Sequence, residues 1–314
     1  MRGLKPGIKD NKLEYLEMIA NENDAIVIAI TETHLKDRID DTEIHINGYS
    51  STRSDRNIRE GGGVMNYVKE HLTISNELRD SDAMNDLLCI FINELNTAIV
   101  TMYRPPDSTV ESFRWSIKKV NIWLSKILQK SDRVRVIVNG DFNLGKLGDW
   151  DDKEIEKTKD KINEKIYNKE TIGSEKAQML ELIEFAEKLG LMQNIKDVTR
   201  EDRILDLVFT NEDIVCDTKY ERHAKISDHD TIILKVDLDT PIEDKTKKEN
   251  FCSTDIPLYK TDQMSSEQIE KAKEFLDAQN WDDIDADKLT DIIERMVKEN
   301  CDLRNPVKTT KEGN

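Results

Sequence analysis

The sequence is poor in cysteine and lacks long apolar runs. Its four cysteines form no CxxC pair, and their spacing suits neither a zinc knuckle nor a disulfide framework; they are Cys89, Cys216, Cys252 and Cys301. We therefore predict free thiols in a reducing compartment. No apolar run approaches the roughly 18 residues of a membrane span, and the first residues do not resemble a secretion signal. We expect a nuclear or cytoplasmic protein with no membrane partner.

Positive charge is also in short supply. The 314 residues include 47 lysines and arginines against 64 aspartates and glutamates, which gives a formal net charge of −17. Phosphate contacts require lysine and arginine, so this composition does not by itself indicate nucleic-acid binding. It favours an acidic enzyme or an interaction protein, unless the negative charge lies away from a DNA-binding face or metal cations offset it within a site.

Apolar patterns predict a mixture of strands and helices over residues 1–238. Strands are expected over residues 25–30, 87–92, 97–103, 134–138, 204–209 and 231–238. Helices are expected over residues 13–20, 113–127 and 174–189, the second of them after a capping-box pattern at Ser108 and Glu111. The hairpin-like strand pairs favour an α/β or α+β arrangement over an all-parallel sheet.

Two segments differ from this pattern. Residues 149–169 are highly charged with mixed sign, and we expect an exposed insertion there. Composition changes near Thr240 and Pro241, and beyond this point the sequence predicts a charged linker and a helical tail without strands. We therefore expect one domain over residues 1–238 and an appendage over residues 239–314.

Polar residues suited to metal and phosphate chemistry stand at the ends of predicted strands. Glu32 follows one strand, and Asp141 and Asn143 follow another. Asp206 lies within a third strand, and His229 precedes a fourth. Singly, each fits an ordinary turn, cap or loop residue, because such residues favour turns. Together, they combine the carboxylates that Mg²⁺ prefers with a histidine able to stabilise a phosphoryl transition state, which are the groups that phosphodiester cleavage requires.

The order of the short motifs resembles the endonuclease/exonuclease/phosphatase superfamily. The motifs are Thr-Glu-Thr (31–33), Tyr-Arg-Pro-Pro (103–106), Gly-Asp-Phe-Asn (140–143), Leu-Asp-Leu-Val-Phe (205–209) and Ser-Asp-His (227–229). The resemblance covers residues 2–238 and implies a four-layered α/β sandwich, in which two packed mixed β-sheets are flanked by helices. It also implies a phosphodiesterase that depends on a divalent cation, Mg²⁺ with Mn²⁺ as an alternative.

Within the superfamily, the sequence is most similar to the apurinic-endonuclease-like endonuclease domain of non-LTR (LINE-type) retrotransposons. Gly-Gly-Gly-Val (61–64), Tyr-Arg-Pro-Pro and Ile-Leu-Asp-Leu-Val-Phe-Thr-Asn (204–211) carry this similarity. The resemblance implies an enzyme that nicks double-stranded DNA and leaves 5′-phosphate and 3′-hydroxyl ends. In the retrotransposons the 3′-hydroxyl end primes reverse transcription. Element RNA and a reverse transcriptase domain are the further implied partners, and residues 239–314 would begin the linker to that domain.

The resemblance implies a role for each residue that would act on the metal, the water or the phosphate. Glu32 would ligate Mg²⁺, and Asp228 would help to place the metal ion or the neighbouring histidine. Asp141 would orient or deprotonate the attacking water, and Asn143 would hold the scissile phosphate.

Supporting roles are implied for five more positions. His229, paired with Asp206, would stabilise the negative charge that develops on the phosphate. Tyr103 would contact the phosphate or tune the site, with a core aromatic of the strand as the alternative. Arg53 and Arg104 would contact DNA, with solvated loop arginines as the alternative.

The chain departs from the family at its start. The first strand of the family carries an Asn that supports the metal site, and we expect this strand to be missing ahead of Arg2-Gly3-Leu4. Two alternatives to a DNA endonuclease stay open: a phosphatase or RNA exonuclease of the same superfamily, and a catalytically inactive truncated remnant that acts as a scaffold. The triple glycine argues against the first, and the intact Glu32, Asp141 and His229 argue against the second.

Overall fold

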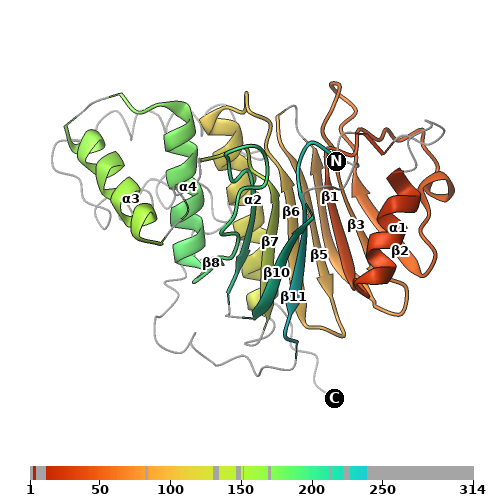
Figure 1. The fold of residues 1–314 in the computed structure, drawn as a ribbon. Coiled ribbons are helices and arrows are strands. Elements are labelled where there is room, and N and C mark those ends of the chain that lie inside the picture. Colours follow the sequence, from red (N-terminus) through yellow and green to blue (C-terminus); the bar gives the residue numbers. More distant parts are fainter. Residues whose placement is uncertain are drawn as a thin grey trace, which may run out of the picture. The chain divides into compact units, whose positions relative to one another are not determined.

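The computed structural model describes residues 3–4, 12–81, 84–129, 134–145, 150, 152–168, 171–211, 214–221 and 227–238. Among these residues, the helices are α1 (Lys12–Glu22), the 3-10 helix η1 (Asp41–Ile44), α2 (Val110–Leu128), α3 (Asp152–Tyr167) and α4 (Ser174–Lys188) (Figure 1). The strands are β1 (Val27–Thr31), β2 (Tyr49–Ser54), β3 (Val64–Lys69), β4 (Ile74–Ser81), β5 (Asp86–Ile92), β6 (Thr97–Tyr103), β7 (Arg135–Asp141), β8 (Met192–Gln193), β9 (Asp206–Thr210), β10 (Val215–Glu221) and β11 (Thr231–Val236). The predicted linker and tail over residues 239–314 lie outside the described residues.

The largest sheet has six strands in the order β4-β5-β6-β7-β9-β8. β6 and β7 run parallel, while the other neighbours pair antiparallel. A parallel pair needs a long crossover connection, and α2 supplies it between these two strands. The α/β class that the sequence predicts is therefore confirmed.

A second sheet has three antiparallel strands in the order β1-β3-β2, and β10 and β11 form a separate antiparallel hairpin. The six-stranded sheet is mixed, as the resemblance implies, whereas the three-stranded sheet is antiparallel among the described residues. Its central strand β3 follows β2 after the short connection 55–63, which is too short for a parallel crossover.

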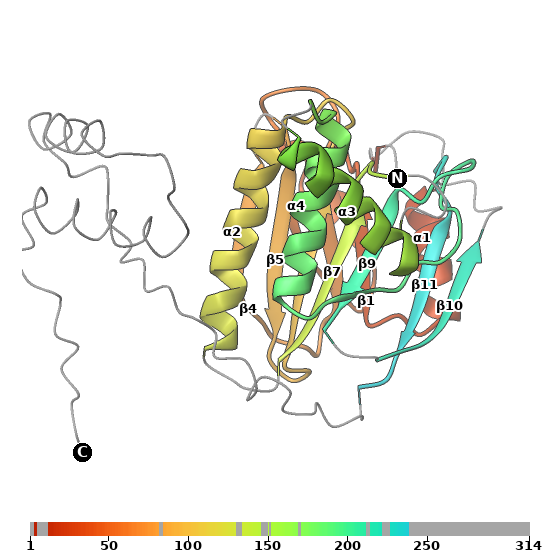
Figure 2. The same ribbon diagram turned by 90° about the vertical axis from the view of Figure 1, so that its left-hand side faces the viewer.

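The sheets and helices stack in four layers. α1 covers the outer face of the three-stranded sheet, where Leu16 and Ala20 pack with Met65 and Tyr67. An apolar layer that joins the two sheets contains Val64, Val68, Leu88, Ile90, Ile99 and Tyr103. α2 and α4 cover the outer face of the six-stranded sheet, as both views show (Figures 1 and 2). The layer order that the family resemblance implies is thus present.

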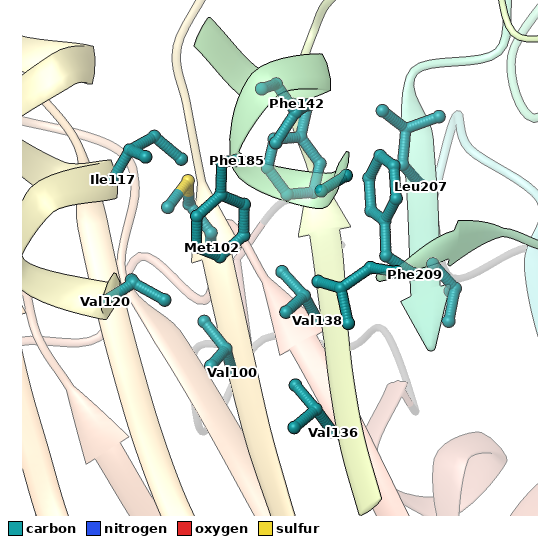
Figure 3. Close-up of a cluster of buried hydrophobic side chains, with 14 of the residues drawn as sticks. Val100, Met102, Ile117, Val120, Val136, Val138, Phe142, Phe185, Leu207 and Phe209 are labelled. Carbon is teal, nitrogen blue, oxygen red and sulfur yellow. The ribbon is translucent and has the colours of Figure 1, made fainter. Parts of the chain in front are cut away.

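The main core lies between the six-stranded sheet and the helices α2 and α4 (Figure 3). Val100, Met102, Val136 and Val138 project from β6 and β7 toward Phe185 of α4. Phe142 and Phe209 pack edge to face, with their ring centroids 6.2 Å apart. Truncation of such a side chain to alanine typically costs about 2–5 kcal/mol. This core holds the carboxyl end of β7 in place.

The capping residue of α2 and the presence of the helix α3 differ from expectation. Thr109, not Ser108, caps α2, because its hydroxyl accepts a hydrogen bond from Ser112 N at 3.1 Å. The hydroxyl of Ser108 instead donates to Asn85 Oδ1 at 2.9 Å. Residues 152–167, expected as an exposed insertion, form α3, whose Ile162 is buried. Ile155 and Ile162 pack this charged helix against the domain, although its composition did not predict a helix.

Five strands lie outside the predicted ranges: β2, β3, β4, β8 and β10. Of these, β4 and β10 are polar and half-buried or exposed throughout. Neither strand has a fully buried residue, so neither shows the apolar alternation that marks a strand with one buried face. Ahead of α1, Gly3 N and Leu4 N donate to the carbonyl oxygens of Glu32 and Thr33 at 3.0 and 2.7 Å. No helix among the described residues is long and apolar enough to cross a membrane.

Candidate active site

The register of the six-stranded sheet places three predicted site residues side by side. Tyr103 on β6 is paired with Asp141 on β7, and Asp141 is paired with Asp206 on β9. Direct partners on neighbouring strands project from the same face of a sheet. Tyr103 belongs to the apolar layer that joins the two sheets, so this row faces the three-stranded sheet. Backbone pairing alone therefore assembles the row.

Glu32 joins the row from the three-stranded sheet. It follows the last residue of β1 and has a left-handed backbone, with φ of 54°. The hydroxyl of Tyr103 donates to Glu32 Oε1 at 2.6 Å. Burial of the ring, together with this hydrogen bond and the charge of Glu32, raises the pKa of Tyr103 well above its usual range. The phenol thus stays protonated and acts as a fixed hydrogen-bond donor to Glu32.

His229 closes the other end of the row. Its Nδ1 lies 2.7 Å from Asp206 Oδ2, and its Nε2 lies 3.9 Å from Asp141 Oδ2. Burial opposes the charge on the ring, yet the hydrogen bond to Asp206 and the charges of Asp206 and Asp141 raise the pKa of His229. The turn before β11 holds the ring, since Ser227 Oγ accepts from His229 N at 3.1 Å.

Asp141 is the most crowded carboxylate of the group. Burial, followed by the nearby charge of Asp206, raises the pKa of Asp141 to about 7, while His229 partly offsets this rise and Glu32 adds to it. Asn143 N donates to Asp141 Oδ1 at 3.1 Å. A buried carboxyl group with a pKa near neutrality is suited to accept a proton from water or to be neutralised by a cation.

The donor set fits a divalent cation. One ligand atom from each of Asp141, Asp206 and His229 lies within 4.8 Å of the others. The two carboxylates suit a hard cation such as Mg²⁺ or Mn²⁺, whereas an imidazole is a ligand that softer ions such as Zn²⁺ prefer. Glu32 is not part of this set, although its charge acts on Asp141. The crowding of negative charge at Asp141 is what a bound cation would relieve.

The loop that carries Asp141 and Asn143 depends on a glycine and on a buried arginine. Gly140 has φ of +147°, and a Cβ there would clash with the carbonyl oxygen of Met102 on β6. Arg104 Nη1 donates to the carbonyl oxygens of Phe142 and Asn143, at 3.2 Å each, and its Nε donates to Gln178 Oε1 at 2.6 Å. Asn143 Nδ2 donates in return to the carbonyl oxygen of Arg104 at 2.9 Å.

Three of the predicted site residues lie apart from the row. Arg104 is buried beneath the loop, where it braces Asn143. Arg53 Nη2 donates to the carbonyl oxygen of Ile39 at 2.5 Å, and its guanidinium also faces Asp41 and Asp55. Asp228 is 39% exposed and forms an ion pair with Arg200 at 2.7 Å. These contacts give each of the three a role within the protein itself.

Arg200 is a site residue that the sequence did not indicate. Its Nη1 lies 3.5 Å from His229 Nε2, and it holds Asp228 beside the histidine. The neighbouring Thr199 accepts hydrogen bonds from the backbone N–H groups of Leu205 and Asp206, at 3.0 and 3.1 Å. An arginine in a polar turn gives no sequence signal, because only the folded turn brings it to the histidine.

Comparison with known proteins agrees with the motif order. Residues 97–233 match the family described as "Endonuclease-reverse transcriptase". This span includes Tyr103, Asp141, Asp206 and His229, whereas Glu32 precedes it. The predicted resemblance to the endonuclease/exonuclease/phosphatase superfamily, whose members are phosphodiesterase-type hydrolases, is thereby confirmed. No curated protein matches the chain.

Solved structures that match the chain include two endonucleases and a phosphatase. An AP endonuclease from Archaeoglobus fulgidus is 14% identical, with 72% of this chain and 94% of that chain covered and a TM-score of 0.49. The endonuclease domain of TRAS1, a telomere-specific non-LTR retrotransposon, is 18% identical, with 73% and 94% covered and a TM-score of 0.48. The 3′ phosphatase NExo from Neisseria, bound to product DNA hairpin, is 10% identical, with 74% and 97% covered and a TM-score of 0.49.

Proposed function

We propose that this protein is a divalent-metal-dependent endonuclease that nicks double-stranded DNA and leaves 5′-phosphate and 3′-hydroxyl ends. The observation that carries the proposal is the row of Tyr103, Asp141, Asp206 and His229, with Glu32 hydrogen-bonded to its end. The row combines a buried carboxyl group, a carboxylate–histidine pair and a positioned acidic ligand within one cluster. These are the groups needed to move a proton, stabilise charge on a phosphate and hold a cation.

In this scheme Glu32 would hold the cation and Asp228 would help to place it, while Asp141, Asp206 and His229 act on the water and the phosphate. A bound Mg²⁺ or Mn²⁺ would polarise a phosphoryl oxygen and favour ionisation of water. Tyr103 orients the Glu32 carboxylate through its 2.6 Å hydrogen bond. Because the phenol keeps its proton, it leaves Glu32 as an anion with a defined orientation.

Asp141 would take the proton from the attacking water. The water oxygen forms a bond to phosphorus, the bond between phosphorus and the 3′ oxygen breaks, and the water's proton passes to Asp141. Asn143, held by Asp141 and Arg104, would position the phosphate through its side chain or backbone. The leaving 3′ oxygen takes a proton from the solvent and becomes the 3′-hydroxyl end, and Asp141 later returns its proton to the solvent.

His229 would carry positive charge toward the phosphate. Asp206 accepts the Nδ1 proton at 2.7 Å, which leaves the opposite ring nitrogen facing Asp141 and the row. A charged imidazole at this place stabilises the negative charge that develops on the phosphoryl oxygens. Arg200, beside His229 Nε2, adds a second positive group at the same end.

The 3′-hydroxyl end of a nick is the end that a reverse transcriptase can extend. The matching family is described as an endonuclease joined to reverse transcriptase, which supports a role in target-primed reverse transcription with element RNA as a later partner. DNA binding by a protein with net charge −17 requires that its acidic excess lie away from the site or be offset by bound cations.

The test is a plasmid-nicking assay with analysis of the ends. Supercoiled DNA is incubated with the protein and Mg²⁺, with EDTA, with the variant Glu32→Ala, and with Asp160→Asn, an exposed aspartate on α3, as a matched charge control. Open circles should form only with metal and intact Glu32, and DNA ligase alone should reseal them. Ligation that first requires end repair, or nicking that persists in Glu32→Ala, would contradict the proposal. Release of phosphate from phosphomonoesters or trimming of RNA, without nicking, would identify one of the alternatives.

A further inference from the structure

A buried ion pair between Arg56 and Asp86 lies next to Tyr103, the hydrogen-bond partner of Glu32, and the proposed reaction gives it no role. Arg56 follows β2, Asp86 begins β5, and the two side chains are 1% and 0% exposed. Arg56 Nε donates to Asp86 Oδ1 at 3.0 Å, and Arg56 Nη2 lies 2.7 Å from Asp86 Oδ2. Arg56 also donates to the carbonyl oxygen of Met84 at 2.7 Å. A buried pair of this kind is often no more stabilising than apolar residues of similar size, so its presence calls for another reason.

The first contact of the pair leads to the side chain of Glu32. The guanidinium carbon of Arg56 lies 5.4 Å from the centroid of the Tyr103 ring, in a cation–π contact. The hydroxyl of the same ring donates to Glu32 Oε1. Arg56 therefore limits how the Tyr103 ring can tilt, and the ring in turn sets the orientation of the Glu32 carboxylate.

The second contact leads to the backbone beside Glu32. Asp86 Oδ2 accepts a hydrogen bond from Gly63 N at 2.8 Å. The carbonyl oxygens of Gly63 and Gly62 accept hydrogen bonds from Thr33 N and His34 N, at 3.2 and 2.8 Å. The ion pair thus holds the triple-glycine loop, and the loop holds the two residues that follow Glu32.

The absence of side chains in the loop is what permits this contact. A Cβ at Gly62 would lie 2.5 Å from Asp86 Oδ2 and 2.6 Å from Arg56 Cζ, and the residue has φ of +71°. A Cβ at Gly63 would lie 2.5 Å from Thr33 Oγ1. The triple glycine therefore lets the loop backbone lie directly between the ion pair and the Glu32 segment.

We propose that Arg56 and Asp86 are positioning residues that fix Glu32 for metal binding, through the Tyr103 ring and through the triple-glycine loop. The inference rests on the proposed function, because it takes Glu32 as a metal ligand. Both side chains are buried, so they would act through Tyr103 and the loop and not by contact with the metal or the DNA. Loss of the pair should loosen both the side chain and the backbone of Glu32. Metal affinity should therefore fall in variants that remain folded.

The experiment measures Mn²⁺ affinity of the full chain without DNA, by titration calorimetry. The variants are Arg56→Met, the charge-balanced Arg56→Met/Asp86→Leu, and Gly62→Ala, each checked by circular dichroism and thermal unfolding. Arg114→Met, which removes the exposed ion pair between Arg114 and Glu181, is the matched control. Mutation of groups that orient metal ligands typically weakens binding by about 10- to 100-fold. We expect a loss in this range for the three variants, and none for the control.

A mutant cycle that combines Glu32→Ala with the ion-pair substitutions separates positioning of Glu32 from a general loosening of the domain. In that background, the Arg56→Met/Asp86→Leu substitutions should cause no further loss of Mn²⁺ affinity, since the ligand they position is gone. Folded variants with parental affinity, or equal losses with and without Glu32, would overturn the inference. Unchanged affinity in Glu32→Ala alone would also overturn it, because Glu32 would then not bind metal. Mn²⁺ binding that depends on Glu32 and on the pair, in a protein that fails to nick DNA, would support positioning while refuting the endonuclease function.

Discussion

Replacement of Asp141 by asparagine should stabilise the metal-free protein at alkaline pH while it abolishes nicking. Burial of this carboxylate, together with the charges of Asp206 and Glu32, outweighs the opposing charge of His229 and raises its pKa from 3.8 to about 7. Asparagine keeps the oxygen that accepts the hydrogen bond from Asn143 N. It removes the negative charge and can no longer take a proton from water.

The sign and size of the effect follow from proton binding. The folded protein binds the Asp141 proton more tightly than the unfolded chain, so the parental stability falls as pH rises from about 4 to about 7. A tenfold difference in proton affinity is worth about 1.4 kcal/mol, and the raised pKa therefore corresponds to at most about 4 kcal/mol. Asp141→Asn lacks this loss. The amount by which its free energy of unfolding exceeds that of the parental protein should therefore be small near pH 4 and largest near pH 8.

Urea unfolding with EDTA present, followed by circular dichroism at about pH 4 and about pH 8, measures this difference. Asp160→Asn removes a carboxylate that is exposed on α3 and serves as the control. Saturating Mg²⁺ should narrow the advantage of Asp141→Asn, because a bound cation stabilises the parental carboxylates. An equal gain at both pH values, or no gain near pH 8, would refute the assignment of Asp141 as a crowded, destabilised carboxylate.

Three further predictions concern other parts of the domain. His229→Ala should lower the nicking rate by about 100-fold or more with little loss of fold, and nicking at the parental rate would exclude His229 from the chemistry. Gly140→Ala should destabilise the protein by more than about 4 kcal/mol in urea unfolding, because its Cβ would clash with a strand carbonyl; Gly173→Ala, where nothing lies within 4 Å, should cost less than about 1 kcal/mol and is its control. Cys89 is buried, and burial raises the pKa of its thiol well above the usual range, whereas Cys216 is exposed. Peptide mapping after N-ethylmaleimide treatment should therefore find Cys216 modified and Cys89 protected until urea unfolds the domain, and early modification of Cys89 would contradict its placement in the core.

The sequence by itself predicted the elements with strong local signals. The prediction for residues 97–103 has the same bounds as β6, and that for 87–92 differs from β5 by one residue. Apolar side chains at helical spacing located α2, since that pattern is a local property of a buried helix face. The order of the short motifs also identified Asp141, Asp206 and His229, which the fold brings within 4.8 Å of one another.

Tertiary structure decided the features that depend on distant residues. Arg104 carries no local sign that it lies beneath the Asn143 loop, and Arg56 none that it pairs with Asp86, 30 residues away. Residues 152–167 gave a charged, insertion-like pattern, yet they form a helix that contacts α4 through an ion pair between Lys159 and Glu187. Periodicity reports which face of an element is buried, but not which residue of another element lies opposite.

The sequence motifs therefore identified the chemical groups of the site, but not how these groups are arranged in space. The three motifs around Tyr103, Asp141 and Asp206 become one row only because β6 pairs with β7 in parallel and β7 with β9 in antiparallel register. A shift of one residue in either pairing would turn the side chains to opposite faces of the sheet. Register is set by packing of the whole sheet against α2 and α4 and against the three-stranded sheet, and this collective choice cannot be read from any single motif.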